Sequence, residues 1–470
     1  MVSLIFAGVL YPEGDMADAK PDGTADGSRQ PVPDISPRRL NPLYLDTMSA
    51  TDTPIPRTTE SYPSDTAPAR PARERLLSLD VFRGMTVAGM LLVNDPGSWA
   101  SIYPPLEHAE WNGWTPTDLI FPFFLFIAGI TTYLSLSARR ARGDSESAIR
   151  AQIIRRGVLI FLFGFLVNGF PYFTFGDVTG IADPTFIQRV GDRLLHWRIM
   201  GVLQRIGVAY MCAALLTQKT TLKQQVAIIA GLLLGYWFVM TALPVPGEGT
   251  IGALLLSEGP RTMAAWTDRL VLDWSRGGLG NHLWVSSKTW DPEGVLSTIP
   301  AIATAMLGNL AGRWIGQRYA LSERLSGLFG AGAVGMMVGS MWHWVFPINK
   351  SLWTSSYVIF TAGMACVSLA TVMWIVDFYK VRGWTKPFVV YGVNPIVAFV
   401  GSGVLARCIY SIFKVSHDGK RISLEAWIHQ TFFASWLSPV NASLAFAITF
   451  VLFWYAILHV LYKRNIILKV

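Results

Sequence analysis

Charged residues and cysteines are scarce in this chain of 470 residues. Asp, Glu, Lys and Arg make up 15% of the sequence, and there are 3 cysteines. Soluble domains carry about 25% charged residues, so the low charge and the mean hydropathy of +0.38 argue against a soluble fold. Cys212, Cys366 and Cys408 stand inside apolar runs without a CxxC or Cys/His spacing. Neither a disulfide framework nor a metal site is indicated, and no metal is expected.

The sequence also lacks the motifs of the common soluble enzymes. No phosphate loop, dinucleotide glycine pattern, G-x-S-x-G elbow or HExxH pair stands in a suitable context. The net charge of +8 comes from short Lys and Arg groups between apolar runs rather than from one basic domain. We therefore expect no nucleic-acid partner, and we interpret the placement of these charges as a signal of membrane topology.

The first 75 residues differ in composition from the rest. Residues 11–75 are rich in Pro, Asp, Ser, Thr, Ala and Arg and show little apolar periodicity. Such a segment cannot bury enough apolar surface to fold. The prediction is a disordered tail over 1–75, followed by a transmembrane domain over 76–470.

Apolar runs of about the length that spans a bilayer, roughly 20 residues, fill the remainder. They predict an all-α fold, a polytopic membrane helix bundle of about 10 transmembrane helices. The expected spans lie near 79–96, 116–137, 153–171, 199–217, 224–243, 294–312, 326–346, 354–377, 387–412 and 440–462.

Lys and Arg recur after every second expected span, and cytoplasmic loops carry such an excess. The loop between the first two spans has no Lys or Arg from Asp95 to Pro116. This bias predicts that the N- and C-termini are cytoplasmic and that the loop holding His108 lies on the opposite side. The basic groups include Arg73 and Arg75, Arg139 to Arg142, Lys219 and Lys223, Arg313 to Arg324, Lys380 to Lys386, and Lys463 and Arg464.

The segment "LEHAEWNGWTPTDLIFPF", residues 106–123, sets reactive side chains beside an apolar run. Thr115 suits a helix cap, Pro116 the first helical position and Asp118 the first turn, which predicts a helix start here. His108 then lies in a short loop with Glu107, Glu110 and other polar residues. A neutral imidazole there can take a proton or attack an acyl group. The alternative is an interfacial loop whose tryptophans anchor at the lipid headgroups.

Polar residues inside the expected spans are costly in hydrocarbon and should face a polar interior. Gln204 and Arg205 lie in the fourth span and Asn394 in the ninth. Arg205 is the strongest candidate for holding an anion such as a phosphate. The alternative is hydrogen bonding between helices. Asp291 and Glu293, which precede the sixth span, either cap that helix or line the same site as His108.

Several segments together resemble one family, the multi-spanning acyltransferases typified by heparan-alpha-glucosaminide N-acetyltransferase, which includes bacterial members. The resemblance runs in order from about residue 75 to near the C-terminus. Its segments are "RLLSLDVFRGMTVAGMLLVN" (75–94), "HAEWNGWTPTDLIFPFFLFIAG" (108–129), "GVLQRIGVAY" (201–210), "WDPEGVLSTIPAIATAMLGNLAG" (290–312), "FPINKSLWTSSYV" (346–358) and "KPFVVYGVNPIVAFVG" (386–401).

The resemblance implies an enzyme that moves an acetyl group from cytosolic acetyl-CoA to an amino sugar or envelope glycan across the membrane. It implies that His108 is catalytic and that Asn94 belongs to the same site. Arg205, Gln204 and Asn394 become candidates for binding acetyl-CoA. The expected location is the bacterial inner membrane, multi-pass, with the His108 loop periplasmic.

Three questions stay open at this point. The acetyl group could pass through an acetyl-histidine or directly to the acceptor. A homodimer is neither required nor excluded. The rival function is a sugar or amino-sugar transporter that binds its solute at the intramembrane polar residues.

Overall fold

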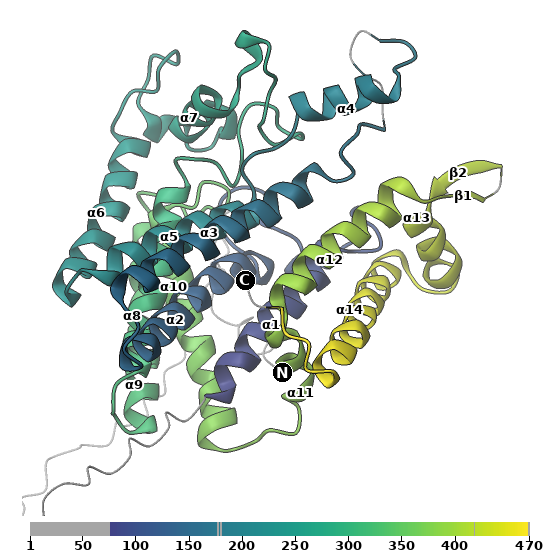
Figure 1. Cartoon of the computed structure of the whole chain (residues 1–470). Coiled ribbons are helices and arrows are strands. Elements are labelled where there is room, and N and C mark those ends of the chain that lie inside the picture. The colour runs from purple at the N-terminus through teal and green to yellow at the C-terminus, as the bar shows by residue number, and fades with distance from the viewer. Residues whose placement is uncertain (1–75, 176–177, 179–180, 418, 469–470) are drawn as a thin grey trace, which may run out of the picture. The chain divides into compact units, whose positions relative to one another are not determined.

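The structure is a computed structural model that describes residues 76–468 apart from 176–177, 179–180 and 418. The predicted tail over 1–75 lies outside the described residues. Helices dominate the described part (Figure 1). They are α1 Leu77–Asn94, α2 Ile120–Ala141, α3 Glu146–Gly169, α4 Phe186–Leu195, α5 Val202–Gln218, α6 Leu222–Thr241, α7 Met263–Leu272, α8 Thr298–Ile315, α9 Leu321–Trp342, α10 Ser355–Met373, α11 Lys386–Val393, α12 Pro395–Arg407, α13 Leu424–His429 and α14 Pro439–Lys463. Two strands, β1 Lys414–His417 and β2 Lys420–Ser423, pair antiparallel in a hairpin.

Eight helices of the described chain are long and apolar enough to cross a membrane, which confirms the predicted class of polytopic all-α membrane protein. The prediction of about ten spans differs from this count by two. The expected spans near 199–217 and 294–312 do fold as helices, α5 and α8, with 17 and 18 residues. α5 is one residue shorter than the 18 residues of the shortest of the eight, and α8 carries the polar residues Asn309 and Arg313.

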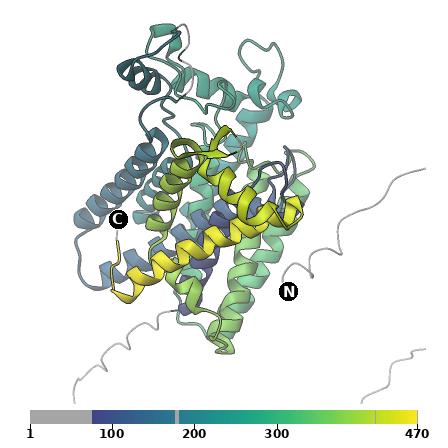
Figure 2. The ribbon, with the colours of Figure 1, turned by 90° about the vertical axis from the view of Figure 1, so that its right-hand side faces the viewer.

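The loops divide between the two ends of the bundle. We call the end that carries loop 95–115, α4, α7 and loop 343–354 the outer end, and the opposite one the inner end. In Figure 1 α4 and α7 lie at the top, beyond the C-terminal ends of α3 and α6. α1 begins and α14 ends at the inner end, as the predicted topology requires, and α14 runs along the outside of the bundle (Figure 2).

Small residues allow the central helices to approach closely. A Cβ on Gly84 of α1 would lie 1.7 Å from the carbonyl oxygen of Phe388 in α11. A Cβ on Gly129 of α2 would lie 2.1 Å from the carbonyl oxygen of Ala305 in α8. Close backbone contact at small residues is how membrane helices gain packing without a hydrophobic drive between them. It fixes α1 and α2, the two helices that flank the His108 loop.

The ninth expected span, 387–412, is broken in the middle. α11 ends at Val393, and Pro395 begins α12 after Asn394, whose backbone is not helical, at φ −124 and ψ 55. Proline has no N–H to donate and disfavours the helical conformation in the residue before it. The break gives α12 a direction of its own, and α12 forms one wall of the cavities described below.

Candidate active site

The His108 loop is held by the first turn of the helix that follows it. The Asp118 side chain, 1% exposed, accepts hydrogen bonds at Oδ2 from the backbone N–H groups of Ala109 and Thr115, both at 3.0 Å. Its Oδ1 lies 2.7 Å from His108 Nδ1. The predicted helix start at Thr115 is confirmed as a capping box. Asp118 thus caps the turn Pro116–Leu119 and also orients the imidazole, a second role that the sequence did not indicate.

A second loop brings a cation to the same histidine. Lys350 Nζ lies 2.9 Å and 3.0 Å from Nδ1 and Nε2 of His108, and 3.5 Å from Asp118 Oδ1. Because a carboxylate only accepts, Nδ1 donates to Asp118, and Nε2 is left to accept from Lys350. Burial lowers the pKa of Lys350 below its usual 10.5, and the charges of Asp118 and Glu293 oppose that change.

Backbone and amide contacts fix the two loops to each other. Asn349 Nδ2 donates to the carbonyl oxygen of Trp111 at 2.9 Å, and the Gly113 N–H donates to Ile348 at 2.8 Å. The Tyr357 hydroxyl at the start of α10 donates to the carbonyl oxygen of Asp118 at 2.6 Å. His108 therefore sits on a rigid frame although it lies in a loop.

His108 and Asn94 line one cavity of about 190 Å³. Asn94 is the last residue of α1, and the other polar residues of the lining are Lys350, Glu293, Thr86 and Thr117. Apolar side chains of α1, α2, α5 and α12 form the rest. We call this cavity the His108 chamber. The two residues that the family resemblance indicated, Asn94 at the end of α1 and His108 in the following loop, thus line the same cavity.

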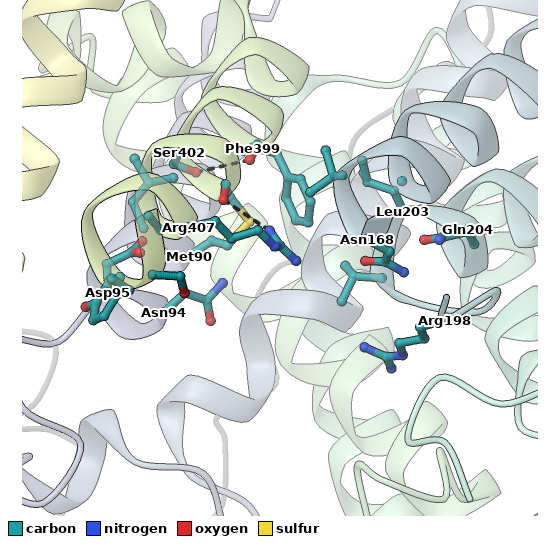
Figure 3. A pocket seen from close by; sticks show the side chains of 18 of the residues that line it. Met90, Asn94, Asp95, Asn168, Arg198, Leu203, Gln204, Phe399, Ser402 and Arg407 are labelled. Atoms are coloured by element: carbon teal, nitrogen blue, oxygen red, sulfur yellow. Dashed lines mark hydrogen bonds between the residues drawn. The ribbon is translucent and has the colours of Figure 1, made fainter. Parts of the chain in front are cut away.

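A larger cavity of about 480 Å³ opens beside the chamber at the outer end. Figure 3 shows Asp95 and Arg407 on one side of it, and Asn168, Gln204 and Arg198 on the other. We call it the vestibule. Burial raises the pKa of Asp95 to about 7. The Nε2 of Gln204 is buried and makes no hydrogen bond with a described residue, so this amide is available to a bound molecule.

The acidic pair before α8 belongs to this region. Arg198 contacts Asp291 at 2.8 Å and 2.5 Å and Glu293 at 2.5 Å. Glu293 also lines the His108 chamber while Arg198 lines the vestibule, so this ion pair lies in the wall between the two. Asp291 and Glu293 were expected either to cap the next helix or to line the same site as His108. The structure supports the second interpretation for Glu293.

A third cavity, of about 80 Å³, extends from the chamber among the inner halves of the helices. Its lining is apolar except for a few groups, among them Arg83 and Arg156. Arg83 pairs with Asp80 at 2.8 Å. Arg156 packs over the ring of Tyr210 at 5.0 Å, and its Nε is buried without a hydrogen bond to a described residue. We call it the inner cavity.

The three cavities follow one another along the bundle. The vestibule and the chamber share Met90, Asn94, Val202 and Phe399 in their linings. The chamber and the inner cavity share Phe124, Ile206, Pro395 and Phe399. The row therefore leads from the outer end past His108 toward the basic inner half.

Arg205 and Asn394 line none of these three cavities. Arg205 is fully buried, bonds Ser297 Oγ and the carbonyl oxygen of Gly294, and stacks 5.1 Å from the ring centroid of Trp353. Asn394 uses its amide on the C-terminal segment, donating to Ile466 at 2.9 Å and accepting from Leu468 at 3.0 Å. Of the three residues considered for acetyl-CoA, only Gln204 faces one of these cavities.

Two of the loop tryptophans pack inside the protein. Trp111 donates from Nε1 to Leu256 at 2.8 Å and meets Trp290 edge to face, and Trp114 packs on Phe360. Trp99, 63% exposed, lines the vestibule. Anchoring at lipid headgroups, the alternative for this loop, therefore suits Trp99 alone of these three.

Comparison of the sequence with known proteins finds one family. Residues 75–263, which include Asn94, His108 and Asp118, match the family model of the catalytic region of heparan-alpha-glucosaminide N-acetyltransferase. The proteins of that name from Mus musculus and Homo sapiens are 29% and 30% identical to the chain, over 419 and 376 residues. These alignments cover 79% and 70% of this chain and 57% and 53% of the relatives. The chain thus spans about half the length of the curated relatives that it matches.

Proposed function

We propose that this chain, which belongs to the heparan-alpha-glucosaminide N-acetyltransferase family, is a transmembrane acetyltransferase that moves an acetyl group from acetyl-CoA to an amino sugar or glycan. The observation that carries the proposal is the row of cavities with His108 in the middle. We expect a donor and an acceptor that enter from opposite ends to meet at the His108 chamber, which shares lining residues with both of the other cavities.

The inner cavity fits part of the donor, because its volume of about 80 Å³ admits a segment of the neutral arm while the nucleotide would lie beyond it toward the inner end. Acetyl-CoA joins an anionic nucleotide to a long neutral arm that ends in the thioester. Arg83 and Arg156 offer cationic groups to phosphates, and the apolar lining toward His108 suits the arm. We assign no contact with the donor to Arg205 or Asn394, because neither lines these cavities.

The volumes set where each substrate is held. Binding pockets of small molecules measure about 300 to 1,000 Å³. The vestibule, at about 480 Å³, falls in this range and suits a monosaccharide unit. The chamber, at about 190 Å³, is too small for a whole substrate and suits the two reacting groups alone.

The side chains of the chamber supply the chemistry. Asp118 holds Nδ1 of His108 as a donor, which makes Nε2 the basic nitrogen. In the proposed reaction the attacking amine takes the place of Lys350 at Nε2, and Nε2 accepts the amine proton. Asn94 donates from its amide to the thioester oxygen as negative charge builds there. The amine nitrogen bonds to the acetyl carbon, the carbon–sulfur bond breaks, and the thiolate leaves.

Direct transfer and an acetyl-histidine intermediate both fit this geometry. In the second route Nε2 itself attacks the thioester, and the amine then displaces the imidazole. Rapid quenching of the protein with labelled acetyl-CoA and no acceptor distinguishes them. Label on His108 supports the covalent route, and its absence at all times supports direct transfer.

The proposed location is the inner membrane of a bacterium, with the outer end of the bundle facing the periplasm. The Lys and Arg residues of the inner loops support this orientation through the positive-inside bias. Labelling of single cysteines introduced at the exposed loop residues Glu110 and Gly143 tests it. A periplasmic Glu110→Cys reacts with an impermeant reagent in intact cells, and a cytoplasmic Gly143→Cys does not.

Acetyl transfer to a panel of amino sugars by the protein in detergent tests the proposed activity. We expect transfer by the wild type, none by His108→Ala, and a raised melting temperature of the wild type with acetyl-CoA. The rival function, transport, predicts the reverse pattern. Uptake of an amino sugar that survives His108→Ala, without stabilisation by acetyl-CoA, would sink the enzyme proposal.

A further inference from the structure

Phe399 has a special place in the row of cavities. Among the described residues it is the one side chain that lines the vestibule, the His108 chamber and the inner cavity alike. Every other lining residue belongs to one or two of them. Phe399 therefore stands where the three cavities adjoin, and its side chain forms part of the wall of each.

The backbone explains how a phenylalanine comes to this point. Pro395 starts α12 after the break at Asn394, and Phe399 follows one turn into the new helix. The next turn is held from outside, since a Cβ on Gly401 would lie 2.3 Å from the ring of Trp454. The ring packs against the central core together with Phe124 and Val202, which also line the chamber.

We propose that Phe399 is a specificity-determining residue that limits the acyl group reaching His108 to a short chain and keeps vestibule water from the thioester. This inference rests on the proposed acetyl transfer. The chamber is small, and an acyl group longer than acetyl would have to extend from the reacting carbon into the space that the ring of Phe399 fills. A shorter side chain would join the chamber to its neighbours and open that space.

The experiment uses the full chain in detergent, with acetyl-, propionyl-, butyryl- and hexanoyl-CoA as donors and glucosamine as the acceptor. For each donor the transfer gives kcat/KM, and release of CoA without acceptor gives the hydrolysis rate. In hydrolysis, water adds to the thioester carbon and the carbon–sulfur bond breaks, which yields the carboxylic acid and the thiol.

We expect Phe399→Ala to raise the ratio of butyryl to acetyl kcat/KM at least about tenfold, since one methylene in a fitted pocket is worth about that factor. Hydrolysis without acceptor should rise as well. Phe399→Trp should change the ratio in the opposite direction. An unchanged ratio in both variants, with acetyl transfer retained, would overturn the inference.

Two controls keep the result interpretable. Phe453→Ala removes the same ring from α14, where the side chain is 50% exposed and lines none of the three cavities; its donor profile should match the wild type. If Phe399→Ala does not fold, the ratio of butyryl to acetyl kcat/KM is measured for Phe399→Leu and Phe399→Trp instead. A wild type that transfers no acetyl group would contradict the proposed function, whereas an active wild type with an unchanged ratio contradicts the role of Phe399 alone.

Discussion

The His108 chamber and the Arg205 cluster both bring charged side chains into the helical bundle, but they differ in access. His108, Asp118, Lys350 and Glu293 surround or adjoin a cavity. Arg205 is closed in by Ser297, Gly294 and Trp353 and reaches none of the three cavities. An ionisable residue in a membrane helix is a functional candidate by default. Contact with a cavity therefore distinguishes the charged residues of the candidate site from Arg205, whose bonds lie within the core.

The largest effect should come from His108 itself. We expect His108→Ala to lower kcat about 10² to 10⁴-fold, the usual contribution of a positioned general base. Its melting temperature should stay near that of the wild type, because the side chain is half-exposed. His196→Ala, at an exposed outer-end histidine beside Asp192, is the matched control and should keep full activity. Wild-type activity in His108→Ala would contradict a catalytic role for the His108 chamber.

Asp118→Asn should come next, with a loss of about 10²-fold or more, because the amide cannot both orient the imidazole and accept from the backbone. Kinetic assays and melting curves separate the lost orientation from the lost cap. Asp144→Asn, which breaks an ion pair with Arg139 at the inner end, controls for removal of a carboxylate. Equal activity of the two variants would exclude Asp118 from the site.

Lys350→Met should lower kcat/KM about tenfold, the typical worth of a hydrogen bond to a charged group. Lys350→Arg keeps the charge and should retain more of the activity. The measurement is kcat/KM for both variants at one pH, with the amount of folded protein taken from gel filtration. The cation has no part in orienting His108 if the methionine and arginine variants are equally impaired.

Arg205→Met should affect the fold rather than the reaction. Loss of its buried bonds to Ser297 and Gly294 should cost about 2 kcal/mol of stability, while kcat per folded molecule stays unchanged. The neighbouring variant Gln204→Leu provides the contrast, since Gln204 lines the vestibule. It should raise the KM for the acceptor with little change in melting temperature. A weaker affinity of Arg205→Met for acetyl-CoA would contradict this prediction and would indicate that Arg205 binds the donor.

Asp95 should affect stability, and only in part of the pH range. Burial raises its pKa to about 7 in the folded chain, against about 3.9 in an unfolded one. Below the lower value both states are protonated and the group is silent. As pH rises toward 7 the unfolded state loses its proton first, so folding becomes less favourable. Asp95→Asn should therefore gain melting temperature over the wild type at pH 8 and none at pH 4, and an equal gain at both values would contradict this.

Much of the fold followed from local signals in the sequence. The apolar runs gave the helices, and Thr115, Pro116 and Asp118 predicted the helix start that the structure confirms. The two expected spans that are not among the eight, α5 and α8, still fold as helices of 17 and 18 residues. Pro395 was visible as well, but the break that it makes between α11 and α12 was not predicted.

The site was harder to predict because its parts are distant in the chain. Lys350 is 242 residues from His108, and no local pattern connects them. Gln204 and Arg205 are adjacent, yet neighbours on a helix point about 100° apart, so one faces the vestibule and the other the core. Asn394, like Gln204, is a polar residue within an expected span, but its amide donates to the carbonyl oxygen of Ile466 in the C-terminal segment.

We expect donor and acceptor to reach His108 from opposite ends of the bundle, and transfer across the membrane of sealed vesicles is the direct test. The protein is reconstituted with acetyl-CoA enclosed and glucosamine outside, neither of which crosses the bilayer unaided. The account predicts N-acetylglucosamine outside from the wild type, none from His108→Ala, and none when both substrates are supplied on one face alone. Product that forms only when both substrates share a face would contradict it.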